Sequence, residues 1–269
     1  MQPFLLRREE ERRIYNCLRQ IQEENDVRVL LAVESGSRAW GFASKDSDWD
    51  VRYVYVHRPE WYFHIEERRD VIENMFENDI DAVGWDLKKT LSQLKRSNPA
   101  LMEWMKSPIV YKCDYKFMDA LNEIIPKCYN PIRAMYHYHR IYVKHDERYL
   151  QKQGYPMKRF LYYLRGILAC QWIERYKTIP PVKFQKLYEE MVSDPGIKQE
   201  IDTLIRYKTI SKEMDMSEVP AKLVEYAKKY ADYYIKVVND FRPSFDNNGI
   251  NEVLNKLFFE TVKNFSNEL

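Results

Sequence analysis

The 269-residue sequence predicts an α+β protein, with a small mixed-sheet domain at residues 1–110 followed by an all-helical domain at residues 111–269. Two segments predict the sheet: residues 27–33 are almost continuously apolar, and residues 49–56 alternate and are rich in β-branched and aromatic side chains. From residue 86 onward, apolar positions recur at helical spacing instead. The order of these patterns indicates a sheet first and a helical region after it.

The N-terminal elements can be assigned in order from their periodicity. Residues 5–24 carry well-spaced apolar side chains among many charges, which predicts an amphipathic helix packed on a larger body. The buried strand at 27–33 ends at the polar segment Glu34-Ser35-Gly36-Ser37. The strand at 49–56 follows, and residues 80–85 form a candidate third strand.

Helices take over at Asp86, which is well placed to cap a helix carrying Leu87, Leu91 and Leu94 on one face. Asn98-Pro99 breaks that helix, because proline favours the first turn of a new one. One of the remaining predicted helices begins at Pro99 and another at Pro220. The others span residues 132–151, 156–176 and 250–265.

Composition and charge exclude several classes of protein. The chain is 45% hydrophobic with seven glycines, which excludes collagenous and Gly-rich disordered proteins. Its four cysteines are far apart and predict neither a zinc site nor a disulfide framework. With no apolar leader or membrane-length segment, we expect a soluble cytoplasmic protein that does not associate with membranes. The oligomeric state is left open.

Charge is unevenly distributed although the net charge is only +2. Residues 1–110 hold 17 basic and 20 acidic residues, whereas residues 128–177 hold ten Lys and Arg against three acidic residues. An acidic first half is therefore joined to a half with a basic belt, which is a candidate contact for phosphates.

A compact motif at residues 36–50 carries the chemistry. Gly36 lets a phosphate approach the backbone, and Ser37 adds a hydroxyl at a predicted helix N-terminus. Asp48 and Asp50 follow at i and i+2 on entering a strand, so both carboxylates lie on one face and can share divalent ions. Two such ions would neutralise triphosphate charge and activate a hydroxyl for attack on the α-phosphate.

This Gly-Ser turn followed by Ser-Asp-x-Asp resembles the nucleotidyltransferase superfamily of DNA polymerase β. More narrowly, the chain resembles the predicted nucleotidyltransferases of the RNA repair pathway DNA polymerase beta family. The matching segments are GSRAWG at 36–41, SDWDVR at 47–52, GWDLKK at 84–89, SNP at 97–99, EWM at 103–105, MKRFLYYLR at 157–165 and PP at 180–181.

The resemblance implies a polymerase β-like catalytic domain that uses Mg²⁺ or Mn²⁺ to transfer a nucleoside monophosphate from an NTP, with release of pyrophosphate. It also implies a third carboxylate from a neighbouring strand as a metal ligand and catalytic group beside Asp48 and Asp50. Asp81, at the start of the strand 80–85, is the first choice. Asp86 is the second, although it also reads as a helix cap, and Asp79 is the third.

Basic and aromatic residues near the motif are candidates for nucleotide binding with Gly36 and Ser37. They are Arg38 and Arg52 beside the carboxylates, and Lys158, Tyr162 and Arg165 on one face of a later helix. Arg165 lies in an otherwise apolar segment, so it needs a partner. That partner is either an internal carboxylate or the phosphates of a bound nucleotide.

The predicted acceptor is an RNA end, on the strength of the resemblance and the basic, aromatic helices. A protein hydroxyl or a small molecule is an alternative acceptor, because the same metal site serves all three. A noncatalytic nucleotide-sensing module that binds RNA or protein is the alternative from another class. The intact Ser37, Asp48 and Asp50 argue against it.

Overall fold

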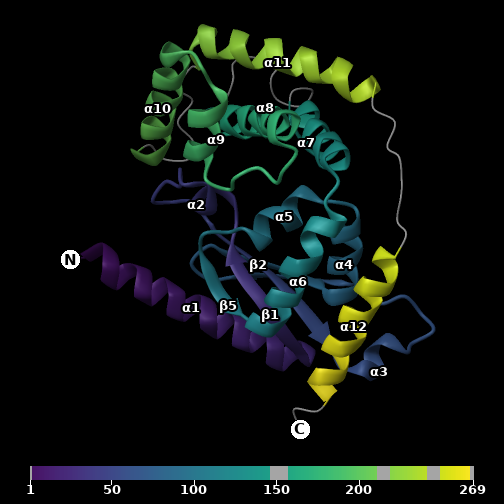
Figure 1. Ribbon diagram of the computed structural model, residues 1–269. Helices are drawn as coiled ribbons and strands as arrows, with labels where there is room; N and C mark the ends of the chain where they lie inside the picture. Colours follow the sequence, from purple (N-terminus) through teal and green to yellow (C-terminus); the bar gives the residue numbers. More distant parts are fainter. Residues whose placement is uncertain (1, 146–156, 211–218, 241–248, 267–269) are drawn as a thin grey trace.

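The computed structural model describes residues 2–145, 157–210, 219–240 and 249–266. One five-stranded mixed sheet is surrounded by helices (Figure 1), which confirms the α+β class. The strands are β1 Val27–Glu34, β2 Trp49–His57, β3 Val71–Phe76, β4 Ile80–Asp86 and β5 Val110–Cys113. The described helices are α1 Gln2–Asn25, α2 Gly36–Trp40, α3 Pro59–Tyr62, α4 Leu87–Lys95, α5 Pro99–Met105, α6 Tyr115–Cys128, α7 Pro131–His145, α8 Met157–Tyr176, α9 Phe184–Met191, α10 Pro195–Ile210, α11 Ala221–Asp240 and α12 Ile250–Ser266.

The strand order β3-β4-β2-β1-β5 places β2 and β4 side by side near the centre of the sheet. These two strands are parallel, whereas the other neighbouring pairs are antiparallel. Both strands of the parallel pair therefore begin at the same end of the sheet. That end is where the motif loop after β1 enters β2.

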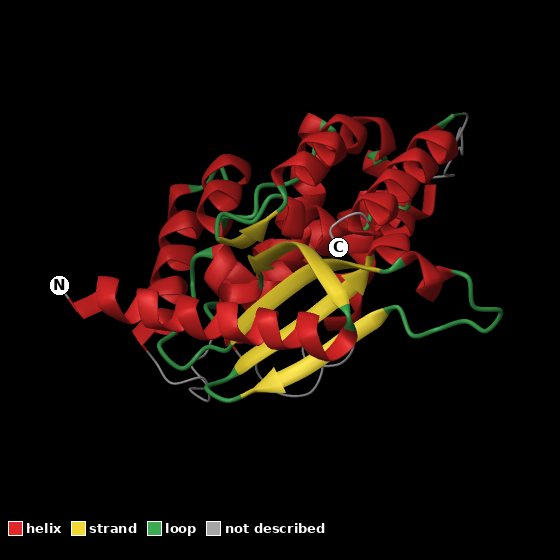
Figure 2. Ribbon diagram, turned by 90° about the horizontal axis from the view of Figure 1, so that it is seen from below, coloured by secondary structure: helices red, strands yellow, loops and turns green. Residues whose placement is uncertain are grey.

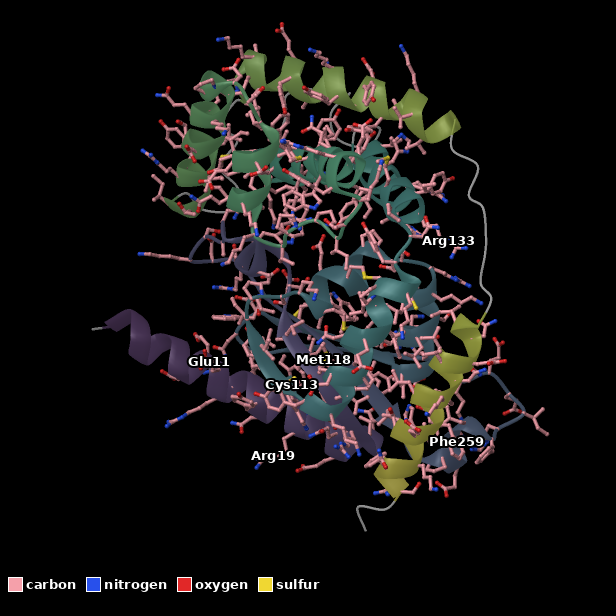
Figure 3. The ribbon with its side chains drawn as sticks, in the orientation of Figure 1. Glu11, Arg19, Cys113, Met118, Arg133 and Phe259 are labelled. Atoms are coloured by element: carbon pink, nitrogen blue, oxygen red, sulfur yellow. The ribbon has the colours of Figure 1, made fainter. Side chains whose placement is uncertain are left out.

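Each face of the sheet is covered by its own helices. Seen from below, α1 crosses one face (Figure 2), where its buried residues Ile14, Leu18 and Ile21 pack on strand residues such as Val29 and Tyr53. Helices α4, α5, α6 and α12 cover the other face through a second core, built around side chains from all four helices and from β1 and β2. In Figure 3 the labelled Met118 marks α6 in this layer. The sheet is thus held rigidly between two apolar layers.

A third core joins α7 to α11 beside the sheet body. Helix α8 runs through its centre and is buried over most of its length, and the other four helices bury apolar side chains in the same core. Phe42, from the loop after α2, also belongs to this core at 1% exposure. The motif loop is therefore packed against the helical part as well as the sheet.

The division into domains near residue 110 stays a prediction. The contacts add that β5, α6 and α12, all beyond that position, pack with the sheet or with the helices that cover it. In the parts of the chain that the structure describes, no helix is long and apolar enough to cross a membrane.

The strands β1, β2 and β4 and the predicted helices are present, with ends that differ by a few residues; residues 146–151 and 156 of two predicted helices lie outside the described residues. The sequence did not predict β3, β5, α3, α6, α9 or α10. The strand β3 is a half-buried edge strand with charged side chains, so its alternation is weak. The turn that follows β3 does have a sequence signal, the pair Asn78-Asp79. Both residues take positive φ (60° and 57°), as a tight hairpin requires.

Candidate active site

The register of the parallel strands brings two of the predicted carboxylates together. Asp50 pairs with Asp81 across β2 and β4, so the two residues lie side by side at the start of their strands. Asp48 comes just before β2, in the loop that leads from α2. Side chains at paired positions of neighbouring strands point to the same face, so Asp50 and Asp81 share one edge of the sheet.

Arg52 bridges this carboxylate pair. Its Nη2 donates to Asp50 Oδ1 and to Asp81 Oδ2, each at 2.8 Å, and its Nη1 donates to the backbone oxygen of Asp81 at 2.8 Å. All three side chains are 17–30% exposed, so the cluster is partly screened by solvent. The guanidinium therefore supplies positive charge at the point where the two carboxylates meet.

The electrostatics of Asp50 identify its neighbours. Burial raises the pKa of this carboxyl above its ordinary value, the charge of Arg52 lowers it, and the charges of Asp81 and Asp48 raise it. Lys158 of α8 also lowers the pKa of Asp50. Asp48, Asp81 and Lys158 are thus each within electrostatic reach of Asp50.

The glycine turn lies directly against Asp50. Gly36 has φ +56°, and a Cβ at this position would stand 2.1 Å from Asp50 Oδ2 and 2.9 Å from Asp50 Cγ. The backbone N–H of Ser35 donates to the carbonyl of Asp50 at 2.8 Å. Only glycine allows this approach without displacing the carboxylate. Ser37 follows as a buried residue in the first turn of the short helix α2.

Glu34, at the end of β1, supports the backbone of Asp50, and the sequence did not single it out. Its side chain is fully buried, accepts the backbone N–H of Asp50 at 2.9 Å, and accepts the hydroxyl of Tyr111 on β5. Burial, above all, raises the pKa of Glu34 to about 7. The only local signal was an acidic residue at the end of a buried strand. Its partner Tyr111 is 77 residues away.

Arg38 is positioned to hold the loop before β2. Its Nε donates to the backbone oxygen of Asp48 at 3.0 Å, its Nη2 donates to the backbone oxygen of Ser47, and its guanidinium lies 3.8 Å from the ring centroid of Trp49. A predicted contact between Arg38 and phosphate stays a prediction. The bonds present fix the backbone that carries Asp48.

Arg165 has an internal carboxylate as its partner. The Nη1 atom of this 3%-exposed residue donates to Glu103 Oε1 at 2.7 Å. The same carboxylate accepts the hydroxyl of Tyr138 at 3.0 Å and the indole N–H of Trp40 at 2.9 Å. This ion pair is the first of the two alternatives for Arg165, and its predicted contact with phosphates stays a prediction. Glu103 therefore ties the motif helix α2 to α7 and α8.

We expect Glu103→Ala to lower the free energy of unfolding by about 3–5 kcal/mol, because it leaves the Arg165 guanidinium buried without its counter-charge. Urea unfolding followed by circular dichroism measures this loss. The double variant Glu103→Ala/Arg165→Met removes both charges and should be more stable than Glu103→Ala alone. A double variant that is less stable than the single one would contradict this role for the pair.

Other residues of the helical part also reach the motif. The ring of Tyr162 lies 4.6 Å from Trp40, centroid to centroid, beside the same short helix. Lys208 of α10 is 2% exposed and donates to Ser44 Oγ at 2.8 Å, in the loop between α2 and Asp48. Lys183 packs beside Gly41 at the end of α2. Sequence analysis missed both lysines, since neither lies in a recognisable motif.

The carboxylates fit a divalent cation as a pair with a third nearby. Carboxylate oxygens are the ligands that Mg²⁺ and Mn²⁺ prefer, and the mutual repulsion of Asp50, Asp81 and Asp48 favours a cation among them. Within the described ranges, no three His, Cys, Asp or Glu side chains already form a group that could hold a metal. These oxygen ligands therefore suit a divalent cation. In this structure the guanidinium of Arg52 lies between the carboxylates of Asp50 and Asp81.

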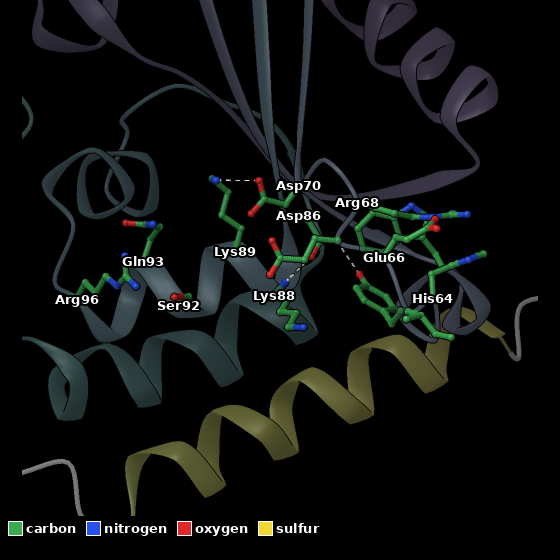
Figure 4. A pocket seen from close by; sticks show the side chains of 14 residues that line it. His64, Glu66, Arg68, Asp70, Asp86, Lys88, Lys89, Ser92, Gln93 and Arg96 are labelled. Atoms are coloured by element: carbon green, nitrogen blue, oxygen red, sulfur yellow. Dashed lines mark hydrogen bonds and ion pairs between the residues drawn. The ribbon is translucent and has the colours of Figure 1, made fainter.

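Neither alternative to Asp81 is paired with Asp50 in the sheet. Asp86 is at the far end of β4, where its Oδ1 accepts the N–H of Lys88 at 2.7 Å and its Oδ2 accepts the hydroxyl of Tyr62 at 2.7 Å (Figure 4). It caps α4, as predicted. Asp79 lies in the hairpin before β4, and its carbonyl accepts the N–H of Trp49 at 2.8 Å. Of the three, Asp81 is the residue paired with Asp50.

The variant Asp86→Asn tests whether Asp86 acts as a helix cap or as a metal ligand. Burial raises the pKa of Asp86 from 3.8 to about 6, so its contribution to stability is fully present below pH 3.8 and is lost as the pH rises through 6. Asparagine caps equally well without this titration. We therefore expect Asp86→Asn to be more stable than the parent at pH 7.5, by about 1–3 kcal/mol, and to equal it near pH 4.

Thermal unfolding across this pH range measures the difference in stability. Nucleotidyl transfer should be unchanged in Asp86→Asn, whereas Asp81→Asn should lose it. Loss of transfer in Asp86→Asn, with its fold intact, would instead assign the third carboxylate to Asp86.

Comparison with known proteins gives one family. The model of the RNA repair pathway DNA polymerase beta family matches residues 11–256. A Bacillus subtilis (strain 168) protein described as uncharacterized protein YcgL is 38% identical over 251 residues, which cover 93% of this chain and 96% of that protein. A solved structure of a nucleotidyltransferase-like protein from Exiguobacterium sibiricum 255-15 covers 94% of this chain and 90% of its own, with 11% identity and a TM-score of 0.34.

Proposed function

Because the chain belongs to the RNA repair pathway DNA polymerase beta family, we propose that it transfers a nucleoside monophosphate from an NTP to the terminal hydroxyl of an RNA. The observation that carries this proposal is the pairing of Asp50 with Asp81, with the Gly36 turn pressed against Asp50. Carboxylates on neighbouring strands beside a glycine turn suit the binding of a metal-bound triphosphate.

In this proposal the residues of the site have distinct tasks. Asp48, Asp50 and Asp81 hold Mg²⁺ or Mn²⁺, which when bound neutralises phosphate charge and acidifies the attacking hydroxyl. The turn at Gly36 and Ser37 receives the triphosphate, and Lys158 faces it from α8. The acceptor oxygen forms a bond to the α-phosphorus, the bond to the bridging oxygen breaks, and pyrophosphate leaves.

Arg52 and Asp81 then have linked tasks. Arg52 holds Asp81 through both its side chain and its backbone oxygen, so it fixes the carboxylate that accepts the proton of the attacking hydroxyl. Arg38 and Glu34 hold the backbone around Asp48 and Asp50. Tyr162 lies beside Trp40 where it can contact the nucleotide, while Arg165 serves through Glu103 to hold α2 in place.

A label-transfer screen tests the proposal. The purified protein is incubated with each α-³²P-NTP, Mg²⁺ or Mn²⁺, and a pool of short RNAs, with Asp48→Ala/Asp50→Ala as the control. Label on RNA that disappears in the control supports the proposal. Metal-dependent NTP binding with label on a protein or small molecule would replace the acceptor, and absence of both binding and transfer would favour a noncatalytic binding module.

A further inference from the structure

Two neighbouring helices carry cations and no acidic residues. The segment 87–98, which contains α4, holds Lys88, Lys89, Lys95 and Arg96, and α7 at 131–145 holds Arg133, Arg140 and Lys144. The whole chain, by contrast, holds 43 basic and 41 acidic residues. Two adjacent helices of one sign are therefore a local concentration of positive charge.

Direct contacts join the two helices into one surface. Arg133 Nη1 donates to the carbonyl of Lys95 at 2.9 Å, and Figure 3 labels Arg133 near the start of α7. Burial lowers the pKa of His137, a hydrogen bond with the backbone of Arg96 raises it, and the charges of Arg140, Arg96 and Arg133 lower it further. The cations of α4 and α7 therefore lie close enough to His137 to disfavour its protonation.

The surface continues into a cavity of about 550 Å³ at the start of α4 (Figure 4). Its lining includes Lys88, Arg96, Arg68 and Trp61. Four acidic residues also line it, but two are already engaged: Asp86 is buried and hydrogen-bonded, and Asp70 pairs with Lys89 at 2.9 Å. The other two, Glu66 and Glu67, lie on the loop opposite α4.

Exposed aromatic side chains accompany these cations. Tyr136 is 47% exposed, and the guanidinium carbon of Arg140 lies 5.8 Å from its ring centroid. Trp61 lines the cavity with a second, half-buried aromatic ring, which is stacked on His57 with the ring centroids 4.0 Å apart. Cations that track a phosphate backbone, with aromatic rings on which bases stack, are the combination that single-stranded nucleic acids bind.

We propose that this surface binds the single-stranded part of the acceptor RNA, upstream of the end that reacts. The α4–α7 surface is defined by Lys88, Lys95, Arg96, Arg133, His137 and Arg140. The identity of the polyanion as RNA rests on the proposed function, whereas the charge and the aromatic rings are properties of the surface itself.

The start of α4, where Lys88 lies, is separate from the active site. Asp81 is near the start of β4 and α4 begins after its end, so about six residues of strand, or roughly 20 Å, separate them. Only an RNA long enough to span that distance can touch both. Transfer to long acceptors should therefore depend on the α4–α7 surface, and transfer to a dinucleotide should not.

Fluorescence anisotropy with a labelled 20-nucleotide single-stranded RNA, in EDTA and without NTP, tests binding independently of catalysis. We expect Lys88→Ala/Arg96→Ala/Arg140→Ala to raise the Kd at least about tenfold at low salt. The slope of log K against log salt should fall by about 2, because each phosphate contact to a single strand contributes about 0.7. The three residues are on the surface, and circular dichroism verifies the fold.

Two controls make the result specific. Arg12→Ala/Arg19→Ala/Lys222→Ala removes the same three charges from α1 and α11 and should leave the Kd within about twofold. Lys88→Arg/Arg96→Lys/Arg140→Lys keeps the charges and should retain binding. Equal losses of RNA binding in the surface and control variants would overturn the proposal. It would also be overturned if Lys88→Ala/Arg96→Ala/Arg140→Ala bound RNA as tightly as the parent but lost binding to phosphatidylserine vesicles.

The outcomes also separate this inference from the proposed function. If RNA binding depends on the α4–α7 surface but the protein transfers no nucleotide, the RNA-binding proposal is supported and the proposed nucleotidyltransferase function is contradicted. If the surface variant transfers nucleotide to long RNA as well as the parent does, the proposed function is supported and the RNA-binding surface is contradicted.

Discussion

Asp50→Asn is expected to reduce nucleotidyl transfer at least about 10³-fold while the protein stays folded. The substitution keeps the shape of the side chain but removes the charge that, with Asp81, would hold the metal. Charge stabilisation by a bound metal is worth several kcal/mol, and each 1.36 kcal/mol is a factor of ten in rate. The loss should lie in kcat at saturating NTP and metal.

Stability is not expected to fall in the same way. Burial and two neighbouring carboxylates already raise the pKa of Asp50, so the ionised form is not favoured by the fold except through Arg52 and Lys158. Thermal unfolding measures this separately from transfer. The matched control is Asp86→Asn, at the other end of the neighbouring strand. Equal transfer by Asp50→Asn and the parent would remove Asp50 from the site.

Gly36→Ala is expected to reduce transfer at least about 100-fold with only a modest loss of stability. At φ +56° an L-residue costs about 1–2 kcal/mol, and its Cβ would lie 2.1 Å from Asp50 Oδ2. The carboxylate can turn away, so the fold survives, but it then leaves the position that the reaction requires. A misplacement of about 1 Å can cost 10²-fold in rate.

Gly249→Ala is the matched control, because Gly249 has φ +83° and, among the residues that the structure describes, no atom lies within 4 Å of the added Cβ. Both variants should lose comparable stability from backbone strain, as measured by urea unfolding. Only Gly36→Ala should lose transfer. Full transfer by Gly36→Ala would show that the close approach of the turn to Asp50 is not needed for the reaction.

The parts of the fold that follow from local periodicity were predictable. The strands β1, β2 and β4 have strong apolar patterns, and Asp86 and Asn98 cap helices where the sequence places them. The edge strand β3 and the four-residue β5 were missed because they are short or half-polar and depend on neighbouring strands for their conformation.

The motif was predictable because it is local, whereas its support is not. Asp48 and Asp50 lie two residues apart, and their spacing alone indicates a shared face. The bonds that hold the site join Tyr111 to Glu34 over 77 residues, Arg165 to Glu103 over 62 and Lys208 to Ser44 over 164. No pattern in one sequence announces pairs so distant, so only the folded chain reveals them.

Mass spectrometry of a defined RNA oligonucleotide after incubation with an NTP and Mg²⁺ or Mn²⁺ tests the central claim most directly. The account predicts an RNA heavier by one nucleoside monophosphate per transfer, with pyrophosphate released in equal amount, and neither product from Asp48→Ala/Asp50→Ala. An RNA that gains only a phosphate, or one that gains a nucleotide equally well with the double variant, would contradict it.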